Sequence, residues 1–329
     1  MARNRLRKAA VNGDGKAALQ LVDMLVDDHR EEEAVEVLRA CAAAGGKEVA
    51  LALADILGVS GDEEYEREAE SWYRIAVEEG LDGALNDYGT FLSVFDDRSE
   101  DAERVLLQAV RSGDTLAYGN LGKVYQDEER YAEALPWLRK SLAAGNTGIL
   151  PFLAQVEIEL GDGENAWKHV REAMEHDQEE APLVCAHYLV RFGDRHPELS
   201  AEGMFREAVE KDDEAYFHFA NWLKDEGRFD EAETQYREAI RHGEVNAHLN
   251  LANLLQDLGR PLEARVELRS GIAARDPWAA VALAHMLADA GLRDEVPAAI
   301  RQAEQLGCPQ EEITGLWAMH HAQRPEGGT

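Results

Sequence analysis

The sequence predicts an all-α solenoid of about nine helix–turn–helix repeats. Three observations support this prediction: a composition that favours helix, a large apolar residue that recurs every 31 to 35 residues, and glycines that recur in step with it. Apolar residues make up 45% of the chain and aromatic residues only 7%, so the chain can bury a core without being rich in strand formers. A fixed period of this length indicates stacked repeats rather than separate domains.

The recurring residue, called the anchor here, is large and apolar in every repeat. A small residue usually precedes it by four positions and another follows it by three, as Ala69 and Ala76 do around Tyr73. This spacing places all three on one face of a helix, where the small residues let a neighbouring helix approach closely. The anchors are Leu38, Tyr73, Leu106, Leu138, Val170, Phe205, Tyr236, Leu268 and Ile300.

Glycines mark where the helices are expected to end. A glycine lies seven residues after the anchor in six repeats, whereas Asp177, Asp212 and Arg275 occupy that position in the other three. Upstream of each anchor a second apolar segment contains a large residue, followed in eight of the nine repeats by Ala or Gly, as in Leu121-Gly122. Each repeat is therefore expected to contain a first helix, a tight turn, a second helix and a stop. Turn glycines lie between the two helices at Gly61, Gly161, Gly193, Gly227, Gly259 and Gly291.

The large–small pair of the first helix and the small–large–small triad of the second resemble tetratricopeptide repeats. The stretch from Ala69 to Ala76, followed by Gly80, resembles the related Sel-one-like repeats. The resemblance covers residues 17–308. It implies a right-handed superhelical α-solenoid whose concave face, lined by the first helices, binds a partner protein or peptide.

Three segments are expected along the chain. Residues 1–16 form a basic N-terminal capping segment, residues 17–308 hold the nine repeats, and residues 309–329 form a C-terminal capping helix and a flexible tail. Caps are expected because the terminal repeats of a solenoid would otherwise expose an apolar face. These segments account for the whole chain and leave no length for a separate catalytic domain, so we expect no enzyme activity.

The charge balance limits the classes of partner. The chain has 65 acidic and 34 basic residues, which gives a net charge of −31. This charge disfavours direct binding to nucleic acid and to anionic membranes. The sequence contains no apolar run of about 18 residues that could span a membrane and no secretory signal, so a cytoplasmic location is expected. The charge is interpreted as a source of solubility, with attraction of a basic partner as the alternative.

Residues 12–16, Asn-Gly-Asp-Gly-Lys, resemble the middle of a calcium-binding loop. Ala10 stands where that loop needs an acid, and Leu21 stands where it needs a glutamate. A phosphate-binding loop is also rejected, because Ala17 replaces the Ser or Thr that would bind the metal. We therefore interpret this segment as a turn before the first repeat.

The sequence contains no pattern of metal ligands. Cys41, Cys185 and Cys308 are scattered and odd in number, which also argues against a disulfide framework. His169 and His176 share a helix face, but no third ligand accompanies them. We expect neither a metal ion nor a cofactor.

An arginine directly follows the anchor in eight of the nine repeats. We expect these arginines to pair with glutamates one helical turn earlier, on the solvated face of the second helix. The alternative is a basic track on an otherwise negative protein. The three expected pairs are Glu70 with Arg74, Glu202 with Arg206 and Glu233 with Arg237.

The first helices present the candidate binding surface. The residue after each large–small pair is polar in all nine repeats, and it shares a face with residues three and four positions later. In the resembling families this face lines the concave groove. Amide side chains can bond a peptide backbone of any sequence, and aspartates attract Lys or Arg. The candidate groove, centred on the last three repeats, comprises Lys123, Gln126, Asn221, Lys224, Asp225, Asn253, Gln256, Asp257, His285 and Asp289.

These observations favour a scaffold or adaptor that binds a basic or neutral peptide or protein segment in its groove. Two alternatives remain open. One is an acidic regulator that occupies the basic site of a nucleic-acid-binding protein, and the other is a small-ligand-sensing or catalytic solenoid. Ordinary exposed polarity would also produce the polar column of the first helices. The sequence leaves the partner's identity and any self-association open.

Overall fold

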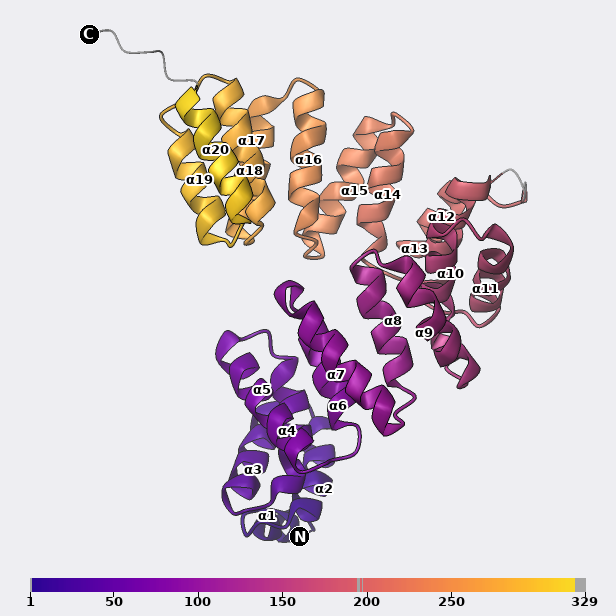
Figure 1. The fold of residues 1–329 in the computed structure, drawn as a ribbon, viewed down its shortest axis with the longest axis vertical. Helices are drawn as coiled ribbons and strands as arrows, with labels where there is room; N and C mark the ends of the chain where they lie inside the picture. Colours follow the sequence, from indigo (N-terminus) through magenta and orange to yellow (C-terminus); the bar gives the residue numbers. More distant parts are fainter. Residues whose placement is uncertain (1, 194–195, 197, 323–329) are drawn as a thin grey trace. The chain divides into compact units, whose positions relative to one another are not determined.

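The computed structural model describes residues 2–193, 196 and 198–322. The regular structure of these residues is entirely helical, without a β-strand, which confirms the predicted all-α class (Figure 1). By its contacts the chain divides into two compact units, Met1–Ala173 and Met174–Thr329. The tail predicted at the C-terminus, residues 323–329, lies outside the described residues.

In the first unit, a single helix precedes five helix pairs, and the two helices of each of the first four pairs pack against each other. The five pairs are α2 with α3, α4 with α5, α6 with α7, α8 with α9, and α10 with α11. The helices are α1 (Ala2–Ala10), α2 (Gly15–Val26), α3 (Glu31–Ala43), η1 (Lys47–Val49), α4 (Ala50–Gly58), α5 (Glu63–Glu78), α6 (Ala84–Ser93), η2 (Asp96–Arg98), α7 (Ser99–Ser112), α8 (Ala117–Asp127), α9 (Tyr131–Ala143), η3 (Thr147–Ile149), α10 (Leu150–Glu159) and α11 (Gly163–Glu175).

In the second unit, four helix pairs are followed by a single helix, so the described residues contain nine pairs in all, as predicted. None of the described helices is both long and apolar enough to cross a membrane. The helices are α12 (Ala181–Phe192), α13 (Ala201–Ala208), α14 (Ala215–Asp225), α15 (Phe229–Arg241), α16 (Asn246–Asp257), α17 (Pro261–Ala273), α18 (Pro277–Asp289), α19 (Val296–Gln305) and α20 (Gln310–Ala322).

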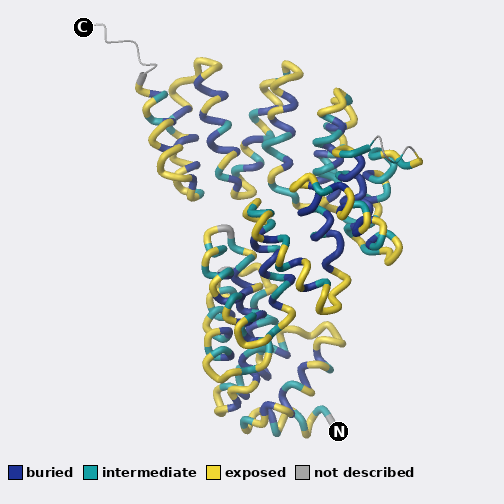
Figure 2. Tube along the Cα trace, turned by 45° about the vertical axis from the view of Figure 1, so that its right-hand side comes forward, coloured by how far each residue is buried: buried dark blue, intermediate teal, exposed yellow. Residues whose placement is uncertain are grey.

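The nine anchors form the centre of each repeat. All are buried, with at most 5% of their surface exposed. Figure 2 shows buried positions running along the helices and exposed positions gathered at the turns. In two repeats the small residue of the first helix is a glycine that leaves no room for a Cβ atom beside the anchor. A Cβ atom on Gly122 would lie 2.4 Å from Cδ2 of Leu138, and one on Gly89 would lie 2.6 Å from Cγ of Leu106.

The helix stops depend on backbone conformation more than on glycine itself. Gly243 ends α15 with a φ of 95°, in the left-handed region that glycine favours. Asp177 and Arg275, which replace glycine at this position, still adopt φ values of 51° and 71°. The position therefore keeps its left-handed geometry in two of the three repeats where the sequence departs from glycine.

The pair α12 and α13 differs from the prediction at both turns. Helix α13 already ends at Ala208, and Asp212, which replaces glycine at the stop position, is not left-handed. Its side chain instead accepts a hydrogen bond from the backbone N–H of Glu214 at 2.9 Å, which supports a different turn. Gly193 likewise keeps a right-handed φ of −52° at the end of α12. A longer connection follows, and Ser200 caps α13 by accepting from the N–H of Gly203.

The turn predicted for residues 12–16 is present between α1 and α2. Gly13 has a φ of 89°, and the carboxylate of Asp14 accepts a hydrogen bond from the N–H of Ala17 at 3.1 Å. Asp14 therefore serves as the N-cap of α2 rather than as part of a calcium-binding loop.

We expect Gly122→Ala to lower the free energy of unfolding by about 1–3 kcal/mol, because the added methyl group would overlap Leu138. Alanine's helix preference, about 1 kcal/mol over glycine, would offset only part of this cost. Gly315→Ala is the matched control, since nothing lies near its Cβ position in α20, and it should raise stability. Urea unfolding followed by circular dichroism measures both. An equal gain in the two variants would contradict the close approach.

Candidate functional site

In the second unit, the polar column of the first helices lies on α12, α14, α16 and α18, and α16 packs against α18. The structure brings eight of the ten predicted groove residues onto α14, α16 and α18. Lys123 and Gln126 lie on α8 of the other unit. The exposed members of the eight are Asp225, Asn253, Gln256, Asp257, His285 and Asp289.

Asn221 is used within the fold. Its Oδ1 accepts a hydrogen bond from the Tyr236 hydroxyl at 2.6 Å and another from Nδ2 of Asn250 at 3.1 Å. These bonds tie α14 to α15 and to the first helix of the next repeat, α16. The oxygen of Asn221 therefore joins neighbouring helices, a role that the column pattern did not reveal.

A second amide bridge joins two first helices in the other unit. Nδ2 of Asn120 on α8 donates to Oδ1 of Asn86 and to Oγ1 of Thr90, both on α6 and both at 2.9 Å. Asn120 and Asn250 each directly precede the large residue of their helix. An amide at this position is thus a signal for a link to the preceding repeat.

Lys224 and Lys123 are both half-buried, and Lys123 lies over an aromatic ring. Its ammonium nitrogen lies 3.7 Å from the centre of the Phe152 ring, within the range of a cation–π interaction. Oε1 of nearby Gln126 is buried without a hydrogen-bond partner among the described residues. Lys123 therefore packs against α10 of the next repeat instead of facing only solvent.

Three of the arginines that follow the anchors form the ion pairs that the sequence predicted. Arg74 binds Glu70 at 2.6 Å, and Arg237 binds Glu233 at 2.8 Å. The third predicted pair, between Arg206 and Glu202, is also present. These contacts favour the ion-pair interpretation over a basic track.

A second set of arginines, at the turn between the two helices, links successive repeats. Arg260 binds Glu263 three residues later through two hydrogen bonds of 2.7 Å. The same guanidinium reaches back to Glu233 on α15 of the preceding repeat, at 2.6 Å. The repeat pattern did not predict this set, although in the sequence each of these arginines has an acidic residue three positions later. Arg98, Arg130 and Arg228 make equivalent pairs of contacts.

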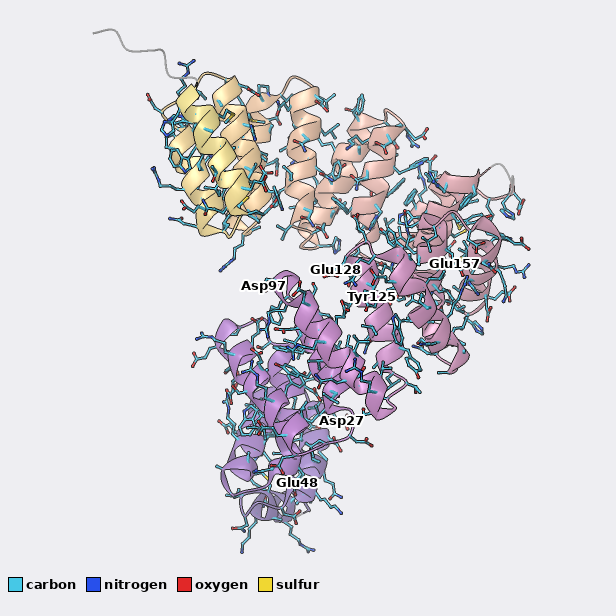
Figure 3. All side chains as sticks on the ribbon, in the orientation of Figure 1. Asp27, Glu48, Asp97, Tyr125, Glu128 and Glu157 are labelled. Carbon is cyan, nitrogen blue, oxygen red and sulfur yellow. The ribbon has the colours of Figure 1, made fainter. Side chains whose placement is uncertain are left out.

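Glu157 is the most deeply buried charged residue among those described, with none of its surface exposed (Figure 3). One carboxylate oxygen accepts from Nη2 of Arg139 at 2.9 Å, and the other lies 2.7 Å from Nδ1 of His169. The three groups come from α9, α10 and α11, so the cluster ties the fifth repeat to the fourth. Within the described part of the chain, no group of three or more His, Cys, Asp or Glu side chains is placed to hold a metal ion.

The column position of α12 is occupied by His187, and its ring packs inside the protein. The ring centre lies 5.0 Å from that of His218 and 6.0 Å from that of Phe205. Burial, with a smaller contribution from His218, lowers the pKa of His187 to about 3. The same column therefore contains a half-buried histidine packed against other rings on α12 and an exposed histidine, His285, on α18.

Two segments of the chain match models of a known repeat family, and solved structures share its fold. Residues 116–145 and 213–241 each match a family model described as a tetratricopeptide repeat. Yeast Tom70 is similar at 17% identity and a TM-score of 0.61, over 98% of this chain and 80% of its own. The human IFIT1 dimer with m7Gppp-AAAA is similar at 13% identity and a TM-score of 0.56, over 94% of both chains. These identities are low, so they establish a shared fold alone. No curated protein matches this chain significantly in sequence.

We expect His187→Phe to weaken the loss of stability on acidification. An imidazole whose pKa falls from about 6.5 in the unfolded chain contributes stability that is full above pH 6.5 and is lost as the pH falls toward 3, because the unfolded state binds the proton first. Between pH 7.5 and pH 5.5 the wild type should lose about 1 kcal/mol more than the variant. Urea unfolding at the two pH values measures this difference. His285→Phe is the control, and the idea fails if both variants behave alike.

Proposed function

We propose that the chain acts as an interaction scaffold rather than as an enzyme, because two of its segments match tetratricopeptide repeat models and its helices form an array of such pairs. Stacked repeats of this kind offer an extended surface on which a partner can lie. The proposed partner is a basic or neutral protein segment, and its proposed site is the exposed face of α14, α16 and α18.

The observation that supports this site is a contrast between the first and second helices. On the second helices, arginines such as Arg237 are neutralised by glutamates. On the first helices, Asp225, Asp257 and Asp289 recur 32 residues apart and all three are exposed. A row of carboxylates attracts Lys and Arg side chains, so charge complementarity favours a basic segment.

Amides supply the second half of the proposed recognition. Asn253 and Gln256 are exposed on α16 beside Asp257, and each amide offers a donor and an acceptor to a peptide backbone. Each such bond contributes only about 0.5–1.5 kcal/mol. Since association costs at least about 4 kcal/mol in lost freedom, several contacts along α14, α16 and α18 have to act together.

The net charge of −31 favours one second candidate, an acidic regulator that occupies the basic site of a nucleic-acid-binding protein. The two candidates differ in their salt dependence. Long-range attraction is screened at moderate ionic strength, whereas hydrogen bonds to a groove are not. Direct binding to nucleic acid is not proposed, because the phosphate backbone would be repelled.

We expect Asp257→Asn combined with Asp289→Asn to weaken partner binding about tenfold, as two exposed charge pairs would be lost. Partners would first be captured from native lysate by the wild type at moderate salt and identified by mass spectrometry. The affinity of the purified partner would then be measured for each variant by calorimetry.

The matched control carries Glu164→Gln and Glu304→Gln, which remove the same charge from exposed positions on α11 and α19. Unchanged binding by the control and weakened binding by the aspartate variant would support the proposed face. Equal weakening by both, together with loss of the complex at moderate salt, would contradict it and favour the acidic regulator.

A further inference from the structure

A cavity of about 860 Å³ lies within the first unit and shares no residue with the groove proposed above. Its walls come from α3, the C-terminal half of α4 and the start of α5, with Val26 of α2 beside them. This volume is within the range of about 300–1,000 Å³ that is typical of ligand sites. The cavity therefore has room for several side chains of a partner.

Large apolar residues line the cavity and continue onto the surface. Val35, Ile56 and Leu57 provide its inner wall. Val59 is 86% exposed and Tyr65 is 42% exposed, although both are large and apolar. A contiguous apolar surface that extends from a cavity into solvent is typical of an interaction site.

The polar lining is acidic. Glu32, Glu36 and Asp55 contribute carboxylates, and the lining includes one cation among the described residues, Arg39. That guanidinium is already bound by Glu68, with an Nε to Oε1 distance of 2.9 Å and a second contact through Nη2. Arg39 therefore adds little positive charge to the cavity, which keeps a net negative lining.

Asp55 gives the cavity a partly buried carboxylate. Its Oδ1 accepts a hydrogen bond from the hydroxyl of the anchor Tyr73 at 3.0 Å. Burial raises the pKa of Asp55 to about 6, so the group is mostly ionised at neutral pH while it is poorly hydrated. A carboxylate in this state gains from a cation that replaces the missing water.

We propose that this cavity binds a partner protein's segment in which a Lys or Arg lies beside a large apolar side chain. The apolar side chain would pack against Val35 and Ile56, and the cation would lie among Glu32, Glu36 and Asp55. The occupant is a polypeptide segment because the exposed rim at Val59 and Tyr65 extends the apolar surface past the cavity. A small amine that filled the cavity would leave this rim in water.

Fluorescence anisotropy with labelled synthetic peptides tests the proposal on the full chain. The probe is the hexapeptide Gly-Leu-Lys-Leu-Lys-Gly, and the comparison probes replace both leucines with serine or both lysines with glutamate. Only the leucine–lysine peptide is expected to bind. Equal binding of the serine–lysine peptide would overturn the proposal, because charge alone would then be sufficient.

Two variants, one at the rim and one in the acidic lining, test the site without changing a buried core residue. Val59→Ser and the double variant Glu32→Gln, Glu36→Gln are each expected to weaken binding of the probe about tenfold, by removing apolar contact or charge. The controls are Val190→Ser, at a residue that is 55% exposed on α12, and the Glu164→Gln, Glu304→Gln variant. Unchanged affinity in both of these variants, or equal weakening in the controls, would overturn the proposal.

Two further arms separate the possible occupants. Hexylamine carries an apolar chain and an amine, as the probe does. If an equal concentration of hexylamine fully displaced the peptide, the cavity would be a site for a small molecule and not for a partner segment. The Asp257→Asn, Asp289→Asn variant should bind the probe as the wild type does. Loss of the probe in that variant alone would place its binding in the C-terminal groove and overturn the cavity as its site, without contradicting the scaffold function.

Discussion

The repeats depend on one large side chain of the second helix, which in eight of the nine faces a first helix that carries Ala or Gly. Leu138 illustrates the constraint, because even a methyl group on Gly122 would overlap it. A helix pair held in this way still has outer apolar faces, and only the neighbouring pairs can cover them. The period of 31 to 35 residues therefore follows from packing: every repeat must present the same faces in the same order.

Polar contacts between arginines and acids then join successive repeats, and they also explain why the surface charge is negative. Arg260 binds acids of two successive repeats, and Arg98, Arg130 and Arg228 do the same. Cations used in this way are neutralised inside the array. Because acids outnumber basic residues by 31, the chain keeps a net negative charge, and carboxylates such as that of Asp257 lie at exposed positions. The linkage between repeats and the acidic exterior are consequences of one distribution of charge.

The sequence was sufficient for several features that depend on one helix or one turn. The anchors, the ion pair of Glu70 with Arg74 and the turn at residues 12–16 all follow from patterns along the chain, and the structure contains them. Features that need three helices escaped prediction. The bond from Asn250 to Asn221 depends on how far one first helix lies from the next, and the cavity beside Asp55 depends on the fit of α3, α4 and α5. A periodic pattern indicates which helix face a residue occupies, but not how deeply neighbouring helices bury that residue.

The polar column of the second unit shows that residues on the same helix face can differ in burial, which reduces the number of residues that can line the groove. Its four positions share one register, yet His187 packs against Phe205 and His218, and Asn221 is bonded to Tyr236 and Asn250. Asn253 and His285 alone keep exposed side chains at the equivalent positions. A polar residue at this position can therefore either join repeats or face a partner, and its neighbours decide which. Since burial decreases from α12 to α18, the surface that could meet a partner is concentrated on α16 and α18, where the aspartates one turn further along the chain are also exposed.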